Sequence, residues 1–304
     1  MGRVLAWALG VCLVVAGAAE ADGRYRIGYG VMFTNDLIGD GDDRWRTGSV
    51  ASSRIYAPGW DGKAPRRFGE MLELRFNGEI IAPDDISDPA PADRPFAGAL
   101  SLGLHTHMAR AGVDYALGAD LVVTGPQTGL DDFQDWLHDR VGGDRIGGAT
   151  RRAQIDDGVH PTGVIEAGRS FDLGAVRLRP FAEARAGIET LVRAGADLSI
   201  GSLTRGEIMV REPVTGQRYR VVREEGAGTA FIFGADIAHV EDSEFLPSRT
   251  GQRAEEKRAR VRGGVHWEGQ GGGSVFYGVT WLGEEFEGQR EGQVVGSLQF
   301  RLRF

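Results

Sequence analysis

The sequence predicts an all-β fold: a transmembrane antiparallel β-barrel of about twelve strands, with a short helix in an extracellular loop. Apolar and polar residues alternate with a period of two along much of the chain, which is typical of strands with one apolar and one polar face. After residue 21 no apolar run is long enough for a membrane helix. The polar faces mix Arg with Glu, and such charges can pair across a barrel interior.

The first 21 residues resemble a secretory signal peptide. Arg3 supplies a positive start, residues 4–17 are apolar, and Ala19-Glu20-Ala21 fits a small-x-small cleavage site. We therefore expect a signal peptide at 1–21 and a barrel domain at 22–304, with a retained anchor helix as the alternative.

Composition excludes several kinds of chemistry. The only cysteine, Cys12, lies inside the predicted signal. A mature chain without cysteine has no disulfide, thiolate metal site or cysteine nucleophile. A net charge of -8 argues against nucleic acid as a partner.

Three segments show the alternation most clearly. Residues 72–80 place apolar residues or Gly at every even position, and 176–189 carry an Ala-rich face opposite Arg and Glu. Residues 258–268 repeat the pattern. Strand-like segments of about ten residues, the length that a tilted barrel strand needs, begin near Arg24, Trp45, Glu70, Pro95 and Gly112, and recur between 160 and 201, 207 and 240, and from 258 to the end.

The last strand carries its own signal. The chain ends in Leu-Gln-Phe-Arg-Leu-Arg-Phe, residues 298–304, with alternating apolar residues and a terminal Phe. This ending resembles the C-terminal signature of outer-membrane barrels, and it implies contact with the barrel-assembly machinery during insertion. Closure into a barrel also removes the exposed strand edges that lipid cannot satisfy.

One helix is predicted, at residues 129–141. Asp131 and Asp132 occupy its first turn, where the helix dipole favours them. Phe133, Trp136 and Leu137 share one face, and the pair of glycines after Val141 ends the helix.

Barrel topology brings distant polar residues to one rim. Both termini of bacterial barrels are periplasmic, so the first strand ends at the exterior rim, and alternate loops lie there too. Counting strands places Asn35, Asp36, Thr47 and His138 at that rim.

Their chemistry is compatible with a hydrolytic site. Asp and Asn oxygens suit Ca²⁺, and His is suited to take a proton from water near neutral pH. Each feature has a plainer interpretation: Asn35-Asp36 is an ordinary turn composition, His138 can be a solvated helix residue, and Thr47 a normal strand residue. His105 and His107 fall near an inner turn, where a structural role is preferred.

Three motifs, in order, resemble those of the outer-membrane lipid A 3′-O-deacylases. The segments that carry the resemblance are FTND (33–36) with DRWRTG (43–48), APDDI (82–86) with DRPFAG (93–98), and VVTGPQTG (122–129) with QDWLH (134–138). Together they cover residues 33–138, whereas the C-terminal half matches only in barrel character and ending.

The resemblance implies a twelve-stranded barrel that hydrolyses an acyl ester of lipid A with a Ca²⁺ ion and a water activated by histidine. The implied site residues are Asn35 and Asp36 at the metal and oxyanion, Thr47 in support, His138 as base, and an acidic residue after the histidine, Asp144 or alternatively Asp139. It also implies a monomer in the cell outer membrane, with its active site facing the exterior and acting on lipid A or lipopolysaccharide in the outer leaflet.

The sequence departs from the family pattern in four places. Thr34 replaces a Glu, Arg46 replaces an aromatic residue, the loop 39–42 is acidic, and no tryptophan-containing segment follows His138. The alternatives are therefore an esterase acting on another lipid, or a non-enzymatic channel or scaffold. A serine phospholipase is weaker, because Ser49 is the only serine near these motifs and lacks a His-x-Ser pattern.

Overall fold

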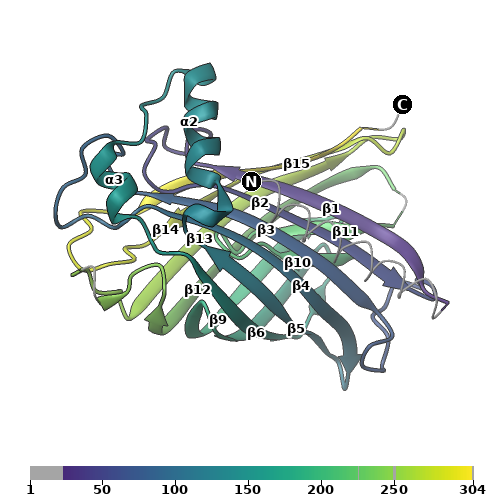
Figure 1. Cartoon of the computed structure of the whole chain (residues 1–304). Helices are drawn as coiled ribbons and strands as arrows, with labels where there is room; N and C mark the ends of the chain where they lie inside the picture. The colour runs from purple at the N-terminus through teal and green to yellow at the C-terminus, as the bar shows by residue number, and fades with distance from the viewer. Residues whose placement is uncertain (1–22, 225, 249–250, 303–304) are drawn as a thin grey trace.

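The computed structural model describes residues 23–224, 226–248 and 251–302; the predicted signal peptide lies outside them. Twelve antiparallel strands form a closed wall, in which each strand pairs with its neighbours along the chain and β1 pairs with β15 (Figure 1). The predicted fold is confirmed. The wall strands are β1 (Tyr25–Asn35), β2 (Trp45–Ala57), β3 (Leu72–Ala82), β4 (Ala97–Arg110), β5 (Val113–Thr124), β6 (Gly158–Gly168), β8 (Val176–Ala186), β9 (Glu189–Gly201), β12 (Gly228–Ser243), β13 (Lys257–Glu268), β14 (Ser274–Leu282) and β15 (Gln293–Arg301), and the short β7 (Phe171–Leu173) also pairs with β8.

Alternation along each strand gives the wall an apolar outside and a charged inside. On β13, Val261 and Trp267 are 53% and 51% exposed, whereas Arg260 and Arg262 are 4% and 3% exposed. Successive strand residues point to opposite faces, so the apolar set faces outward along the whole strand.

Inside the barrel, nearly every carboxylate is matched by arginine. Asp236 on β12 pairs with Arg193, Arg260 and Arg262 from β9 and β13. A charge buried alone is strongly destabilising, whereas a paired one is tolerated. The two histidines of β4 belong to the same kind of network: His105 lies 3.0 Å from Asp120, and His107 lies 2.7 Å from Glu73.

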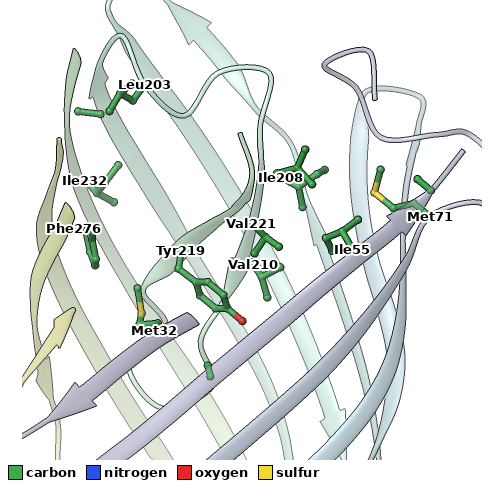
Figure 2. Packing of buried hydrophobic residues seen from close by; sticks show 14 residues of the cluster. Met32, Ile55, Met71, Leu203, Ile208, Val210, Tyr219, Val221, Ile232 and Phe276 are labelled. Atoms are coloured by element: carbon green, nitrogen blue, oxygen red, sulfur yellow. The ribbon is translucent and has the colours of Figure 1, made fainter. Parts of the chain in front are cut away.

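A hairpin inside the lumen was not predicted. The strands β10 (Ile208–Arg211) and β11 (Arg218–Val222) form a separate two-stranded sheet between β9 and β12 in the chain. Figure 2 shows Val210, Tyr219 and Val221 of this hairpin packing against Met32 and Ile55 of the wall. Both faces of the hairpin are buried, so its sequence lacks the contrast that identifies a wall strand.

Three short helices lie at one end of the barrel (Figure 1). They are η1 (Pro126–Thr128), α2 (Leu130–Val141) and α3 (Gly148–Ala153). The helix predicted at 129–141 is confirmed as α2, and α3 was not predicted. We call this end the helix rim, and the end where β1 begins and β15 ends the terminal rim. No helix in the described part of the chain is long and apolar enough to span a membrane.

Candidate active site

The predicted site residues come together at the helix rim. Asn35 is the last residue of β1, Asp36 follows it, Thr47 lies near the start of β2, and His138 lies on α2. Asp36, Thr47 and His138 are all less than 7% exposed. Residues more than ninety positions apart in the sequence are therefore buried side by side.

A bulge at the start of β2 orients Thr47. The pairing of β2 with β3 shifts register between Trp45 and Gly48, and Trp45 has a φ of 52°. Such a value is unfavourable for a bulky residue and persists only where its surroundings hold it. Trp45 is fixed by packing on Leu246 and Phe286. Because of the bulge, both Arg46 and Thr47 are buried, although adjacent strand residues normally face opposite ways.

The contacts of His138 define which of its nitrogens can act as a base. Nδ1 lies 2.5 Å from the main-chain oxygen of Asp144. A carbonyl only accepts hydrogen bonds, so Nδ1 carries the proton. Nε2 lies 3.0 Å from Oδ2 of Asp43 and 3.3 Å from Nε2 of Gln134. Nε2 is thus the nitrogen that faces the rest of the site.

Asp43 is a site residue that the sequence analysis missed. Its Oδ1 accepts a hydrogen bond of 2.5 Å from the Thr47 hydroxyl, while its Oδ2 faces His138. Its side chain is 40% exposed, so solvent reaches the site beside it. Asp43 belongs to the first motif, DRWRTG (43–48), and its place four residues before Thr47 was a usable signal.

The Asp36 carboxylate is held by main-chain N–H groups. Leu37 donates to Oδ1 at 2.8 Å and Arg44 donates to Oδ2 at 3.0 Å. Burial, followed by repulsion from the nearby Asp43 carboxylate, raises the pKa of Asp36 to about 8, against the opposing effect of these hydrogen bonds. Two carboxylates therefore lie close together with too little positive charge around them.

Asn35 shapes the loop that follows β1. Its Nδ2 donates to the main-chain oxygen of Thr47 at 2.7 Å, and its Oδ1 accepts from the N–H of Leu37 at 2.9 Å. This is a local side-chain turn. Asn35 thus ties the end of β1 to the start of β2, and one lone pair of its Oδ1 remains for a ligand.

The acidic residues after His138 do not contact it through their side chains. Asp144 is exposed and reaches the imidazole with its main-chain oxygen. Asp139 pairs with Arg145 at 2.8 Å. The carboxylate beside His138 instead comes from Asp43, in the loop between β1 and β2.

The second motif supports α2 rather than entering the site. A side chain at Gly98 would lie 2.8 Å from Thr128 and 2.9 Å from Leu130, so glycine lets the start of α2 approach β4 closely. Ile86 and Phe96 pack together with Ile146, which lies beyond the helix.

Arg151 of α3 fixes the other side of α2. It makes ion pairs of 2.6 Å with Asp131 and with Asp135. The helix that carries His138 is therefore attached to the barrel on one side and to α3 on the other.

Two departures from the family pattern, Arg46 and the acidic loop 39–42, find charged partners in this structure. Arg46 points into the lumen beneath the site, where it pairs with Glu79, Glu285 and Glu189. Arg44 pairs with Asp40 and Asp42 in the acidic loop and stacks on Trp45. Neither change disturbs the contact between Thr47 and Asp43.

The donor set fits a hard cation in part. Asp36 and Asp43 offer carboxylate oxygens, Thr47 a hydroxyl and Asn35 an amide oxygen, which are ligands that Ca²⁺ accepts. The described residues contain no group of three or more His, Cys, Asp or Glu placed to hold a metal ion. A cation here would therefore complete its shell with water or substrate oxygens.

Comparison with known proteins shows a family and a similar solved structure. The family model described as outer membrane protein LpxR matches residues 4–304. The structure of LpxR from Salmonella typhimurium is similar with a TM-score of 0.71 at 17% identity, covering 90% of this chain and 100% of that one.

Two further solved barrels have lower TM-scores. The NanC porin has a TM-score of 0.39 at 3% identity, covering 91% of this chain and 98% of its own. The β domain of the Bordetella autotransporter BrkA has a TM-score of 0.39 at 11% identity, covering 92% and 100%. No curated protein sequence matches this chain.

Proposed function

The chain belongs to the family of outer membrane protein LpxR, an outer-membrane barrel family, and on that basis we propose that it is a lipid A 3′-O-deacylase. The helix rim would face the cell exterior, because the termini of bacterial barrels are periplasmic. The observation that carries the proposal is the meeting of His138 with Asp43, Thr47 and Asp36 at this rim.

In this mechanism His138 is the general base. With Nδ1–H held by the Asp144 carbonyl, the unprotonated Nε2 takes a proton from a water molecule. The water oxygen then attacks the carbonyl carbon of the ester. The proton passes from His138 to the departing sugar oxygen as the carbon–oxygen bond breaks, so that a free fatty acid and an alcohol are released.

Asp43 orients the imidazole of His138, and its carboxylate has to move away from Nε2 before the reaction. In the structure it occupies the position beside Nε2 that the water must take. Its bond to Thr47 keeps it near the site when it moves. The exposed side of Asp43 is therefore the expected entry for the ester.

Negative charge forms on the ester carbonyl oxygen during attack and requires stabilisation. We place Ca²⁺ at Asp36 and Asp43, with Thr47 and Asn35 nearby, where it would polarise the ester carbonyl. The Gln134 amide N–H₂ group, 3.3 Å from His138, adds a donor on the same side. The amide oxygen of Gln134 is buried and lacks a hydrogen-bond partner among the described residues.

The lumen argues against a wide channel as the function. The hairpin β10–β11 and the arginine–carboxylate pairs occupy much of the interior. A scaffold without activity would have no need to bury an imidazole between a carboxylate and a main-chain carbonyl.

The test is mass spectrometry of lipid A from cells that express the wild type, His138→Ala or Asp36→Ala, with Ca²⁺ or with a chelator. Loss of one acyl chain only with the wild type and Ca²⁺ is expected. His239→Ala is the matched control, since His239 is exposed and lies on β12 rather than on the elements that form the site. Unchanged lipid A with a correctly inserted wild-type barrel would exclude lipid A deacylation under these conditions.

A further inference from the structure

A cavity lies in the lumen, away from the candidate active site. It measures 490 Å³ and opens among the turns of the terminal rim. Its walls come from β3, β4, β5, β6 and β8 on one side and from the hairpin β10–β11 on the other. We call it the terminal chamber. Its volume is within the range of about 300–1,000 Å³ typical of small-molecule sites.

The terminal chamber is strongly positive. Nine Lys or Arg and four Asp or Glu line it, a difference of +5 in a chain whose net charge is -8. A concave surface with one sign of charge and low-dielectric walls concentrates ions of the opposite sign.

The deep arginines of the chamber are neutralised within the barrel. Arg179 pairs with Glu166 at 2.8 Å, and Arg211 pairs with Glu166 at 2.7 Å and with Asp197 at 2.8 Å. These groups fix the hairpin to the wall and leave little charge for a ligand.

The charges at the mouth lack such partners. Lys63 and Arg66 lie in the β2–β3 loop, and Arg110 is the last residue of β4. None of the three makes a side-chain hydrogen bond or ion pair with any residue that the structure describes. Further in, Arg218 donates only to the main-chain oxygen of Met209, at 3.1 Å, among those same residues. Four cations thus converge on one opening without a carboxylate bonded to any of them.

We propose that the terminal chamber is a binding site for a compact, multiply charged anion of the phosphate class, which enters from the periplasmic side. Guanidinium groups match phosphate oxygens with paired, charge-assisted hydrogen bonds. Several such groups around one opening favour an anion with more than one negative charge over chloride. The site is separate from the ester-hydrolysing rim and does not depend on that activity.

The experiment is isothermal titration calorimetry of the full-length barrel with inorganic pyrophosphate, in zwitterionic detergent and 150 mM NaCl. Near this salt concentration, exposed charges are largely screened beyond about 8 Å. Saturable binding at one site per barrel is expected. The triple variant Lys63→Gln, Arg66→Gln, Arg110→Gln should bind at least tenfold more weakly. These three side chains are exposed and have no partner in the part of the chain that the structure describes, so the variant should fold as the wild type does.

Arg169→Gln is the matched control, because Arg169 is an exposed arginine at the same rim that does not line the chamber. It should bind as the wild type does. Arg218→Gln is a second, independent variant and should also weaken binding. Absence of saturable binding, wild-type affinity in the triple variant, or equal weakening by Arg169→Gln would each overturn the proposal. Citrate in place of pyrophosphate, bound equally tightly, would overturn the assignment to phosphate chemistry.

Discussion

The lumen and the helix rim both bury carboxylates, but they treat them in opposite ways. In the lumen, Glu285 contacts Arg46 and Arg94, and Asp236 contacts three arginines. At the rim, the described residues include no arginine or lysine paired with Asp36 or Asp43; the single ion-pair partner of Asp43 is His138. Carboxylates that are paired with arginine support the fold, whereas carboxylates without such a partner are available for a ligand or a reaction.

The largest expected effect comes from removing one rim charge. Asp36→Asn keeps the size of the side chain but removes the charge, and it replaces one of the two oxygens that accept from Leu37 and Arg44 with an N–H₂ donor. We expect deacylation to fall by about 10²–10³-fold, a loss comparable with removal of one electrostatic group from an active site, while the barrel stays folded. Initial rates on purified lipid A, measured by mass spectrometry, check this.

Wild-type rates in Asp36→Asn would contradict the comparison, because the rim carboxylates would then be structural. A gel-mobility assay for the folded barrel excludes misfolding as the cause of a lower rate.

Removing a lumen carboxylate should lower the stability of the barrel and leave its activity nearly unchanged. Arg46 and Arg94 both donate hydrogen bonds to the Glu285 carboxylate. Glu285→Gln removes this shared negative charge. We expect the free energy of unfolding to fall by about 3–5 kcal/mol, typical for one broken buried pair, with the rate per folded barrel nearly unchanged. Urea unfolding followed by tryptophan fluorescence measures it. Glu287→Gln, at an exposed position two residues along, should leave stability unchanged, and equal effects of the two variants would refute the role of the pair.

A smaller effect is expected from displacing the base without changing its chemistry. A Cβ at position 143 would lie 2.7 Å from the His138 ring, so Gly143→Ala should push the imidazole out of line. We expect a rate lower by about 10- to 100-fold, as small misplacements of reacting groups often cause. Gly148→Ala is the control, since a Cβ there meets only the flexible end of Arg152, at 3.3 Å. An unchanged rate in Gly143→Ala would remove His138 from the mechanism.

The effect that is smallest over a single pH unit is a pH dependence of stability. The pKa of Asp36 is raised in the folded barrel to about 8 from 3.8, so the folded state holds a proton that the unfolded chain has lost. This contribution is fully present below pH 3.8 and disappears as the pH rises to about 8. In chelator, wild-type stability should therefore decline relative to Asp36→Asn across this window, by at most about 1.4 kcal/mol per pH unit.

Parallel unfolding curves from pH 5 to 9 test the sign. Ca²⁺ should restore the wild type most at high pH, where protons no longer compete for the carboxylate. A wild type that gains stability with rising pH in chelator, relative to the variant, would show that Asp36 is already neutralised.

The sequence predicted the wall and much of the helix rim, because both follow from short-range patterns of residues along the chain. Alternation fixes which residues of β13 face lipid, and strand counting brings Asn35, Asp36, Thr47 and His138 to one end. The lumen hairpin escaped prediction because both of its faces are buried, so it shows no contrast between faces. Asp43 escaped because its function depends on a contact with His138, 95 residues away, and its place in the first motif does not show that contact.

The hairpin also bears on how the barrel closes. Among the described residues, three pairs join β1 to β15, against nine or more at most other wall contacts. Inside this seam lies β11, where the Arg220 main chain exchanges two hydrogen bonds with the Gln299 side chain of β15 and Val221 packs with Met32 of β1. The short seam and the hairpin stabilise each other, so the barrel should melt as one cooperative unit rather than unzip strand by strand from its ends.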